Sequence, residues 1–285
     1  MSLPSSWPSY ARMLLSRRPS LAPPGFRLEG ATVQARAVIA PARALAAYRE
    51  VCGFDPDAGV LPVTYPHVLA NALHMALLAG PLFPVRGLGL VHLKSTTRAL
   101  RPLPDAAPLD LRCTVEGPRE TDRGQEFDLV TEVRTGAGDA GELAWSETSV
   151  VLARRPGAAG GRKPAPAAAR TDPAPPLARF ELGADLGRRY ARASGDWNPI
   201  HLTVATARLF GFRRPIAHGM WSLARCAAEL SAPAGGVALE ASFKLPVYLP
   251  ATVTLRPEPS ASGTGFSLRD AEGVKPHLVG TLAPL

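Results

Sequence analysis

The chain has 285 residues, of which 46% are hydrophobic and 20% charged, and its formal net charge is +8. This length suits two domains of ordinary size, and the hydrophobic content allows a sizeable core in each. No uninterrupted run of about 18 apolar residues occurs, so we expect no membrane span. The three cysteines, Cys52, Cys113 and Cys226, form no CxxC motif, and we expect them to be reduced thiols in a cytoplasmic protein.

The excess positive charge lies in two segments of unusual composition. Residues 1–28 contain four arginines and no acid, and residues 154–176 contain five basic residues and one acid. Nucleic-acid binding proteins more often carry such charge on a folded surface with interleaved aromatic residues, so we expect no nucleic-acid partner. We interpret residues 1–28 as an N-terminal extension that packs on the first domain or stays mobile. A transit peptide is the weaker interpretation, because prolines interrupt this segment.

The first half, residues 29–153, has the pattern of an α+β domain. A partly alternating stretch predicts a strand at 31–39, and a helix is predicted over 42–51, ending at Gly53. Apolar residues at three- and four-residue spacing predict a longer helix over 66–78. β-rich segments follow at 87–97, 109–115, 126–134 and 144–153, with a hairpin turn at 122–124. A long helix wrapped by an antiparallel sheet fits this order.

The second half, residues 177–285, repeats this plan after a Pro/Ala/Arg linker at 154–176. We predict a short strand at 180–182, a helix over 184–193 that ends at Gly195, and a long helix over 218–230. Strands are predicted at 237–245, 251–256, 265–269 and 277–282. The spacing from Tyr48 to Gly53 equals that from Tyr190 to Gly195, which indicates an old internal duplication.

Two short motifs in the second half carry the residues of a candidate catalytic site. Asp196, Asn198 and His201 lie together around an Asn-Pro turn, and Pro215-Ile216-Ala217-His218-Gly219 leads into the long helix. An aspartate and a histidine that converge on one water can give and take a proton. Backbone N–H groups at the start of a helix can stabilise a negative oxygen. The pattern therefore suggests addition or removal of water next to a carbonyl.

Each of these residues also has a structural interpretation. Asp196 and Asn198 can be turn formers or caps before the proline, and His201 alone can be a buried core histidine. Gly219 can be a close-packing glycine at a helix start. The combination of both motifs favours catalysis. We interpret His218, which is a tempting second base, as a structural or pocket-lining residue.

The stretch YARASGDWNPIHLTVATARLFGFRRPIAHGMW resembles the signature of MaoC-type (3R)-specific enoyl-thioester hydratases, which have the hotdog fold. The whole chain also resembles the two-hotdog 3-hydroxyacyl-thioester dehydratases of the mycobacterial type. This wider resemblance rests on three further stretches: Leu61-Pro62-Val63-Thr64-Tyr65-Pro66, Phe243-Lys244-Leu245-Pro246-Val247 and Lys275-Pro276-His277-Leu278. It implies an α+β double hotdog, in which residues 177–285 form the catalytic domain.

The resemblance also implies the site and the reaction. The implied reaction is reversible hydration of a trans-2-enoyl thioester to a (3R)-3-hydroxyacyl thioester in fatty-acid metabolism. The implied catalytic residues are Asp196, His201, Asn198 and Gly219, whose N–H would hold the thioester oxygen. The implied substrate-binding residues are Ser194, Pro215, Ile216, Ala217 and His218. No metal or redox cofactor is expected, because the thioester carrier, coenzyme A or acyl-carrier protein, is part of the substrate.

The first half lacks the insert that carries the catalytic pair, since only eight or nine residues separate its first helix from its long helix. The resemblance implies that this degenerate half accommodates the acyl chain. Leu69, Leu73 and Met75 are candidates to line that space, although plain core is the favoured interpretation for such a stripe. One chain then forms a pseudo-dimer, which exists alone or as a homodimer. The alternative functions are a hotdog acyl-CoA thioesterase and a non-catalytic acyl-thioester-binding module.

Overall fold

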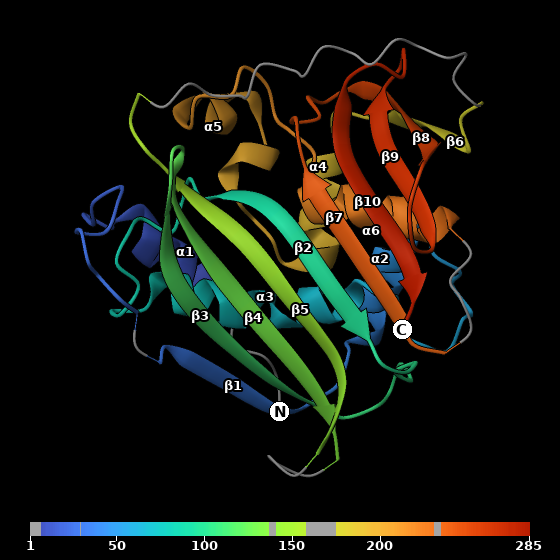
Figure 1. Ribbon diagram of the computed structural model, residues 1–285, viewed down its shortest axis with the longest axis horizontal. Coiled ribbons are helices and arrows are strands. Elements are labelled where there is room, and N and C mark those ends of the chain that lie inside the picture. The colour runs from blue at the N-terminus through green and yellow to red at the C-terminus, as the bar shows by residue number, and fades with distance from the viewer. Residues whose placement is uncertain (1–6, 29, 137–140, 158–174, 231–234) are drawn as a thin grey trace.

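A computed structural model describes residues 7–28, 30–136, 141–157, 175–230 and 235–285. A ten-stranded sheet curves around the helices, and each half of the chain supplies five neighbouring strands (Figure 1). Every strand pair in this sheet is antiparallel. Within the described residues, no helix is long and apolar enough to cross a membrane.

The first half forms strands β1 (Thr32–Val38), β2 (Val91–Ala99), β3 (Leu109–Thr121), β4 (Gly124–Thr135) and β5 (Glu142–Arg154). Its helices are α2 (Ala42–Cys52) and α3 (Tyr65–Ala79), and α3 lies beneath the sheet (Figure 1). Helix α2 ends as predicted, because Gly53 adopts the left-handed conformation with φ 78° and donates back to the carbonyl of Arg49.

The second half forms strands β6 (Ala178–Leu182), β7 (Val237–Phe243), β8 (Ala251–Glu258), β9 (Thr264–Asp270) and β10 (Pro276–Pro284). Its helices are α4 (Leu186–Ser194), α5 (Val204–Leu209) and α6 (Gly219–Glu229), with a 3₁₀ helix, η2 (Pro199–His201), between α4 and α5. Helix α6 takes the place under this half that α3 takes under the first (Figure 1).

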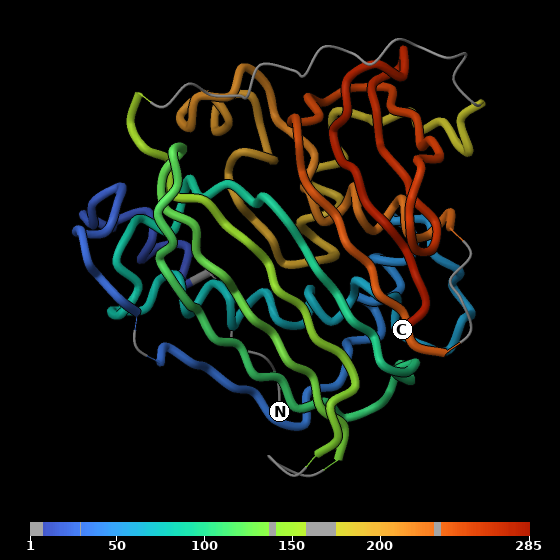
Figure 2. The backbone as a smooth tube through the Cα atoms, in the orientation of Figure 1, coloured from blue at the N-terminus to red at the C-terminus, as the bar shows by residue number. Residues whose placement is uncertain are grey.

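The strand order shows that the two halves share one plan. The order is β1-β3-β4-β5-β2 in the first half and continues as β7-β10-β9-β8-β6 in the second. Strands β2 and β7 join the halves, in a register that runs from Lys94 opposite Ser242 to Ala99 opposite Val237. The chain trace makes the paired halves visible (Figure 2). The predicted α+β double hotdog is therefore confirmed.

The structure adds short elements that the sequence pattern did not predict. The N-terminal extension contains a helix, α1 (Trp7–Leu14), which contacts α3 and buries Tyr10 and Met13. The strand predicted from residue 87 begins only at Val91. The three cysteines are free and buried, as expected. Most of the predicted linker, residues 158–174, lies outside the described residues.

Candidate active site

The Asn-Pro turn brings the predicted aspartate and histidine back toward one another. Helix α4 ends where Gly195 takes a left-handed conformation with φ 73°, and Asp196 follows directly. The side-chain oxygen of Asn198 accepts a hydrogen bond from the Ile200 N–H and caps η2. His201, the last residue of η2, is buried. Asn198 therefore shapes the turn that carries the pair.

The ring of His201 is held in one orientation by a backbone hydrogen bond. Its Nδ1 donates to the carbonyl oxygen of Ile216 at 2.7 Å, which leaves Nε2 as the nitrogen that can accept a proton. Burial lowers the pKa of His201, and this outweighs the opposing effects of Asp196 and the Ile216 carbonyl. The imidazole is therefore neutral near pH 7 and available as a base.

The carboxylate of Asp196 is held by one donor from a distant part of the chain and by one from its own turn. Its Oδ1 accepts the Tyr10 hydroxyl at 2.9 Å and the Asn198 N–H at 3.1 Å. Burial disfavours the charged form, but His218, His201 and these two donors outweigh it and lower the pKa of Asp196. Its own N–H donates to Ser194 Oγ at 3.2 Å. Asp196 is therefore an ionised proton acceptor with a fixed side chain.

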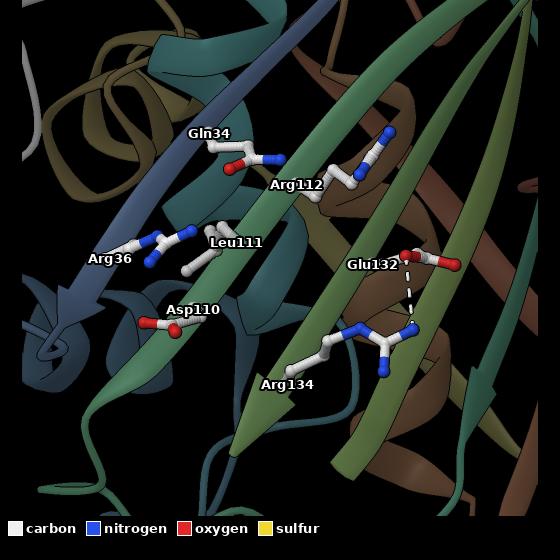
Figure 3. A pocket seen from close by; sticks show the side chains of 7 residues that line it. All are labelled: Gln34, Arg36, Asp110, Leu111, Arg112, Glu132 and Arg134. Atoms are coloured by element: carbon white, nitrogen blue, oxygen red, sulfur yellow. Dashed lines mark ion pairs between the residues drawn. The ribbon is translucent and has the colours of Figure 1, made fainter. Parts of the chain in front are cut away.

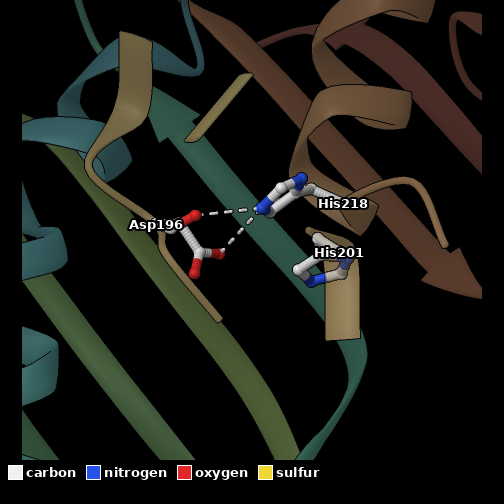
Figure 4. Close-up of side chains that lie close together, drawn as sticks. All are labelled: Asp196, His201 and His218. Carbon is white, nitrogen blue, oxygen red and sulfur yellow. Dashed lines mark hydrogen bonds and ion pairs between the residues drawn. The ribbon is translucent and has the colours of Figure 1, made fainter. Parts of the chain in front are cut away.

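His218 packs against this pair without competing for the same proton. Its ring stacks on His201 with 3.6 Å between centroids, and its Nε2 donates to the Asp196 carbonyl oxygen at 3.1 Å (Figure 4). Burial is the largest cause that lowers the pKa of His218 to about 3, so this ring is neutral. This geometry fits the structural role predicted for His218.

The same three side chains are the residues best placed to hold a cation. One ligand atom from each of Asp196, His201 and His218 lies within 4.8 Å of the others. However, His218 Nε2 carries the proton that it donates to the Asp196 carbonyl, so it has no lone pair for a metal in this arrangement. The donor set therefore suits hydrogen bonding to water better than metal coordination.

Gly219 begins α6 close to an aromatic ring. Its N–H belongs to the first helical turn, where such groups lack intrahelical acceptors. A Cβ at this position would lie 3.0 Å from the Phe243 ring, so a larger residue would require this ring to shift. The preceding residues are hydrogen-bonded to the segment between β7 and β8. Ala217 donates to the Val247 carbonyl, and Leu249 donates to the Pro215 carbonyl. The helix start is therefore firmly placed.

Comparisons with known proteins show the family to which the chain belongs. Residues 169–280 match the MaoC like domain. The chain is 33% identical to 3-hydroxyacyl-thioester dehydratase X of Mycobacterium tuberculosis over 85% of each chain. The chain belongs to the MaoC-like dehydratase family. It is also 29% identical to 3-hydroxyacyl-thioester dehydratase Y of the same organism, over 78% of this chain and 80% of that one.

The structural comparison extends this likeness to the whole double hotdog. The crystal structure of HtdX from Mycobacterium tuberculosis superimposes with a TM-score of 0.77 and 31% identity, covering 89% of this chain and all of that one. The resemblance inferred from the sequence is thus confirmed. This MaoC-like dehydratase is accordingly a hydro-lyase by family, and its fold comes from both halves of the chain.

The small cavity at Asp196 is shared between the two halves of the dehydratase. The second half contributes Tyr190, Ser194, Asp196 and Met220, and α3 of the first half contributes His67, Val68 and Asn71. Of the predicted substrate-binding residues, Ser194 alone lines this cavity. Leu69 and Leu73 are buried in the core, as favoured.

A second hollow lies on the β1–β3–β4 part of the sheet and contains none of the catalytic residues. It is lined mainly by charged side chains, including Arg36, Arg112 and Glu132 (Figure 3).

Three residues at or beside the site were not predicted from the sequence. Tyr10 belongs to a segment without a recognisable motif, and only the fold brings it to Asp196. His67 and Asn71 were assigned to a helix but not to a site. Together with His74 they lie at positions i, i+4 and i+7, a spacing that predicts one polar helix face. This polar face was the sequence feature that could have indicated them.

Proposed function

We propose that this dehydratase catalyses the reversible hydration of a trans-2-enoyl thioester to a (3R)-3-hydroxyacyl thioester in fatty-acid metabolism. The observation that carries the proposal is the convergence of an ionised Asp196 and the unprotonated Nε2 of His201 beside the start of α6. The names of the two mycobacterial relatives support the same reaction.

The two side chains are spaced to share one water molecule. One ring nitrogen of His201 and one carboxylate oxygen of Asp196 lie within 4.8 Å of each other, a separation that one water spans with two hydrogen bonds of about 2.8 Å each. As the water oxygen bonds to C3 of the enoyl group, one acceptor takes its proton, and a proton is delivered to C2. The N–H of Gly219, at the positive end of α6, stabilises the enolate-like thioester oxygen. The product has gained one water and lost the C2–C3 double bond.

The acyl carrier is coenzyme A or acyl-carrier protein, and the reaction needs no metal or redox cofactor. One chain supplies a complete pseudo-dimer, because the cavity at Asp196 is closed by α3 of the other half. A single chain is therefore the smallest active unit, with or without a second copy. Three free buried cysteines suit a reducing compartment, and we place the reaction in the cytoplasm.

The test measures hydration of short and long trans-2-enoyl-CoA, monitored as the loss of the enoyl-thioester absorbance. We expect wild type to form the (3R) product and Asp196→Asn to lose at least ~100-fold in rate, because the variant keeps the shape but loses a proton acceptor. Asp185→Asn is a matched control, since Asp185 is exposed and makes no side-chain cap.

The other outcomes separate the alternative functions. Release of free thiol without hydration would identify a thioesterase. Failure to hydrate either chain length, or the corresponding acyl-carrier-protein substrates, would leave a non-catalytic binding module as the better account. Full activity of Asp196→Asn would contradict the assigned role of this carboxylate.

A further inference from the structure

A buried ion pair lies in the first half, and one of its two members lines the cavity at Asp196. His67 lines this cavity together with Asp196, and its Nδ1 lies 2.6 Å from Glu147 Oε2. The other carboxylate oxygen of Glu147 accepts the Ser95 hydroxyl at 2.6 Å. Glu147 is only 2% exposed, so the pair is enclosed by protein. Nothing in the proposed hydration chemistry uses these residues.

The pair leaves a hydrogen-bond donor facing the cavity. Burial disfavours a cationic His67, but Glu147 outweighs this and raises the pKa of the imidazole. Burial likewise opposes ionisation of Glu147, but His67 and Ser95 bring its pKa down to about 2. A protonated His67 carries N–H groups on both nitrogens, and Nε2 has no protein partner among the described residues. Asn71, one helical turn along α3, lines the same cavity.

The layer behind this pair is polar and has unused hydrogen-bonding capacity. The hydroxyls of Thr97 and Ser149 are fully buried and have no partner among the described residues. Thr97 lies opposite Glu147 in the β2–β5 pairing, and Ser149 lies opposite Ser95. Buried hydroxyls are normally hydrogen-bonded, and neither side chain lines the cavity at Asp196, so these groups show that the layer behind the pair is polar. A site built only for a hydrocarbon tail would be lined by apolar side chains.

A chain of ring contacts connects this layer with the oxyanion glycine. Phe243 packs against Gly219, and its ring centroid lies 4.7 Å from that of His92. The His92 ring stacks on His67 with 6.3 Å between centroids. Phe243, His92 and His67 thus form a row of contacting rings between Gly219 and Glu147, and His67 also lines the cavity at Asp196.

We propose that the His67–Glu147 pair, with Asn71, binds a hydroxyl or keto oxygen on the acyl chain, so that this dehydratase prefers an oxygen-bearing acyl thioester. His67 Nε2–H donates to that oxygen, and a guest hydroxyl donates to the Asn71 amide oxygen. The inference rests on the proposed hydration of enoyl thioesters and adds the class of acyl chain. It replaces the plain hydrocarbon-chain role expected for the first half.

The test compares trans-2-octenoyl-CoA with its derivatives that carry a hydroxyl at C5, C6, C7 or C8. For at least one derivative we expect wild type to show a kcat/KM roughly tenfold or more above that of the unsubstituted chain, because sites with buried hydrogen-bonding groups reject analogues that lack the partner. The double variant His67→Phe/Glu147→Gln should abolish this preference. Removing both partners avoids leaving a single charge buried.

The matched control is Lys94→Gln/Glu240→Gln, which removes an exposed ion pair between β2 and β7 and should keep the wild-type preference. Circular dichroism checks the fold of each variant, and Asn71→Leu tests the same cavity without a change of charge. A wild-type preference for octenoyl-CoA over every hydroxylated derivative, or an unchanged ratio in folded variants, would overturn the proposal.

Calorimetric binding of saturated hydroxyoctanoyl-CoA and octanoyl-CoA separates this inference from the reaction itself. If wild type hydrates no enoyl-CoA but binds the hydroxylated ligand more tightly, the proposed function fails and the polar site stands. If it hydrates octenoyl-CoA and binds both saturated ligands equally, the function stands and the polar site fails.

Discussion

Tyr10 lies 186 residues before Asp196 in the chain, yet its hydroxyl donates to the carboxylate at 2.9 Å. The same hydroxyl oxygen accepts the N–H of Trp197 at 3.1 Å, so it holds both the side chain and the backbone of the Asp-Trp pair. Burial, together with the charge of Asp196, raises the pKa of Tyr10 and keeps it a donor. The N-terminal segment thus supplies a positioning residue for the catalytic half.

Tyr10→Phe tests this role. Loss of a hydrogen bond to the carboxylate removes stabilisation of its charged form, so the pKa of Asp196 should rise. We expect kcat/KM to fall roughly tenfold and the acid limb of its pH profile to move to higher pH. Met13→Leu is the control, because it changes the buried face of the same helix but keeps the hydrogen bond. If the acid limb of the pH profile does not move, Tyr10 acts only as a packing residue.

At the scale of elements, the contact between α4 and η2 depends on Gly187. A Cβ at this position would lie 1.9 Å from the carbonyl oxygen of His201, which belongs to the backbone and cannot rotate away. Gly187→Ala should therefore displace η2, destabilise the fold by roughly 1–3 kcal/mol and lower kcat more than tenfold. Thermal melting and enoyl-CoA hydration measure the two effects.

The control for this substitution is Gly183→Ala. Its Cβ would meet only the side chain of exposed Asp185, which can move aside. Wild-type rate and melting temperature in Gly183→Ala, with losses in Gly187→Ala, would show that the close approach matters. Equal behaviour of the two variants would contradict it.

Whether a feature could be predicted from the sequence depends on how far apart along the chain the interacting residues lie. Gly53 and Gly195 end their helices through local backbone conformation, so both ends were predictable. The candidate dyad was predictable because one turn carries it. Helices as short as α5 and η2 bury too few residues to show an apolar period. Tyr10 reaches the site through tertiary packing, which no local pattern encodes, and the polar face of α3 does not by itself show that His67 faces Asp196.

At the scale of the whole molecule, the two halves share a strand order but differ in what they enclose. The second half carries the candidate dyad on the segment that follows α4, with Asp196 just after this helix and His201 at the end of η2. The first half encloses a polar layer between α3 and strands β2, β4 and β5, with His74 donating to or accepting from Thr131 at 2.7 Å. The duplicated fold therefore contributes a reacting wall and a polar wall to one cavity.

This buried polar layer should make the whole molecule sensitive to acid. Burial, followed by the charge of His67, lowers the pKa of His74 to about 3, whereas the unfolded chain binds a proton near pH 6.5. As the pH falls from about 6.5 toward 3, the unfolded state gains a proton that the folded state excludes. The free energy of unfolding should therefore fall by up to about 1.4 kcal/mol per pH unit from this residue alone.

His74→Gln removes this titration while its amide can still hydrogen-bond to Thr131. Urea unfolding of both proteins at pH 8, 6.5, 5.5 and 4.5 measures the difference. We expect a constant offset between the variant and wild type above about pH 6.5, where neither state of His74 is protonated, and a smaller loss of stability in the variant at each step below it. Parallel curves over the whole range would mean that His74 takes up its proton equally in both states, which is incompatible with a buried neutral imidazole.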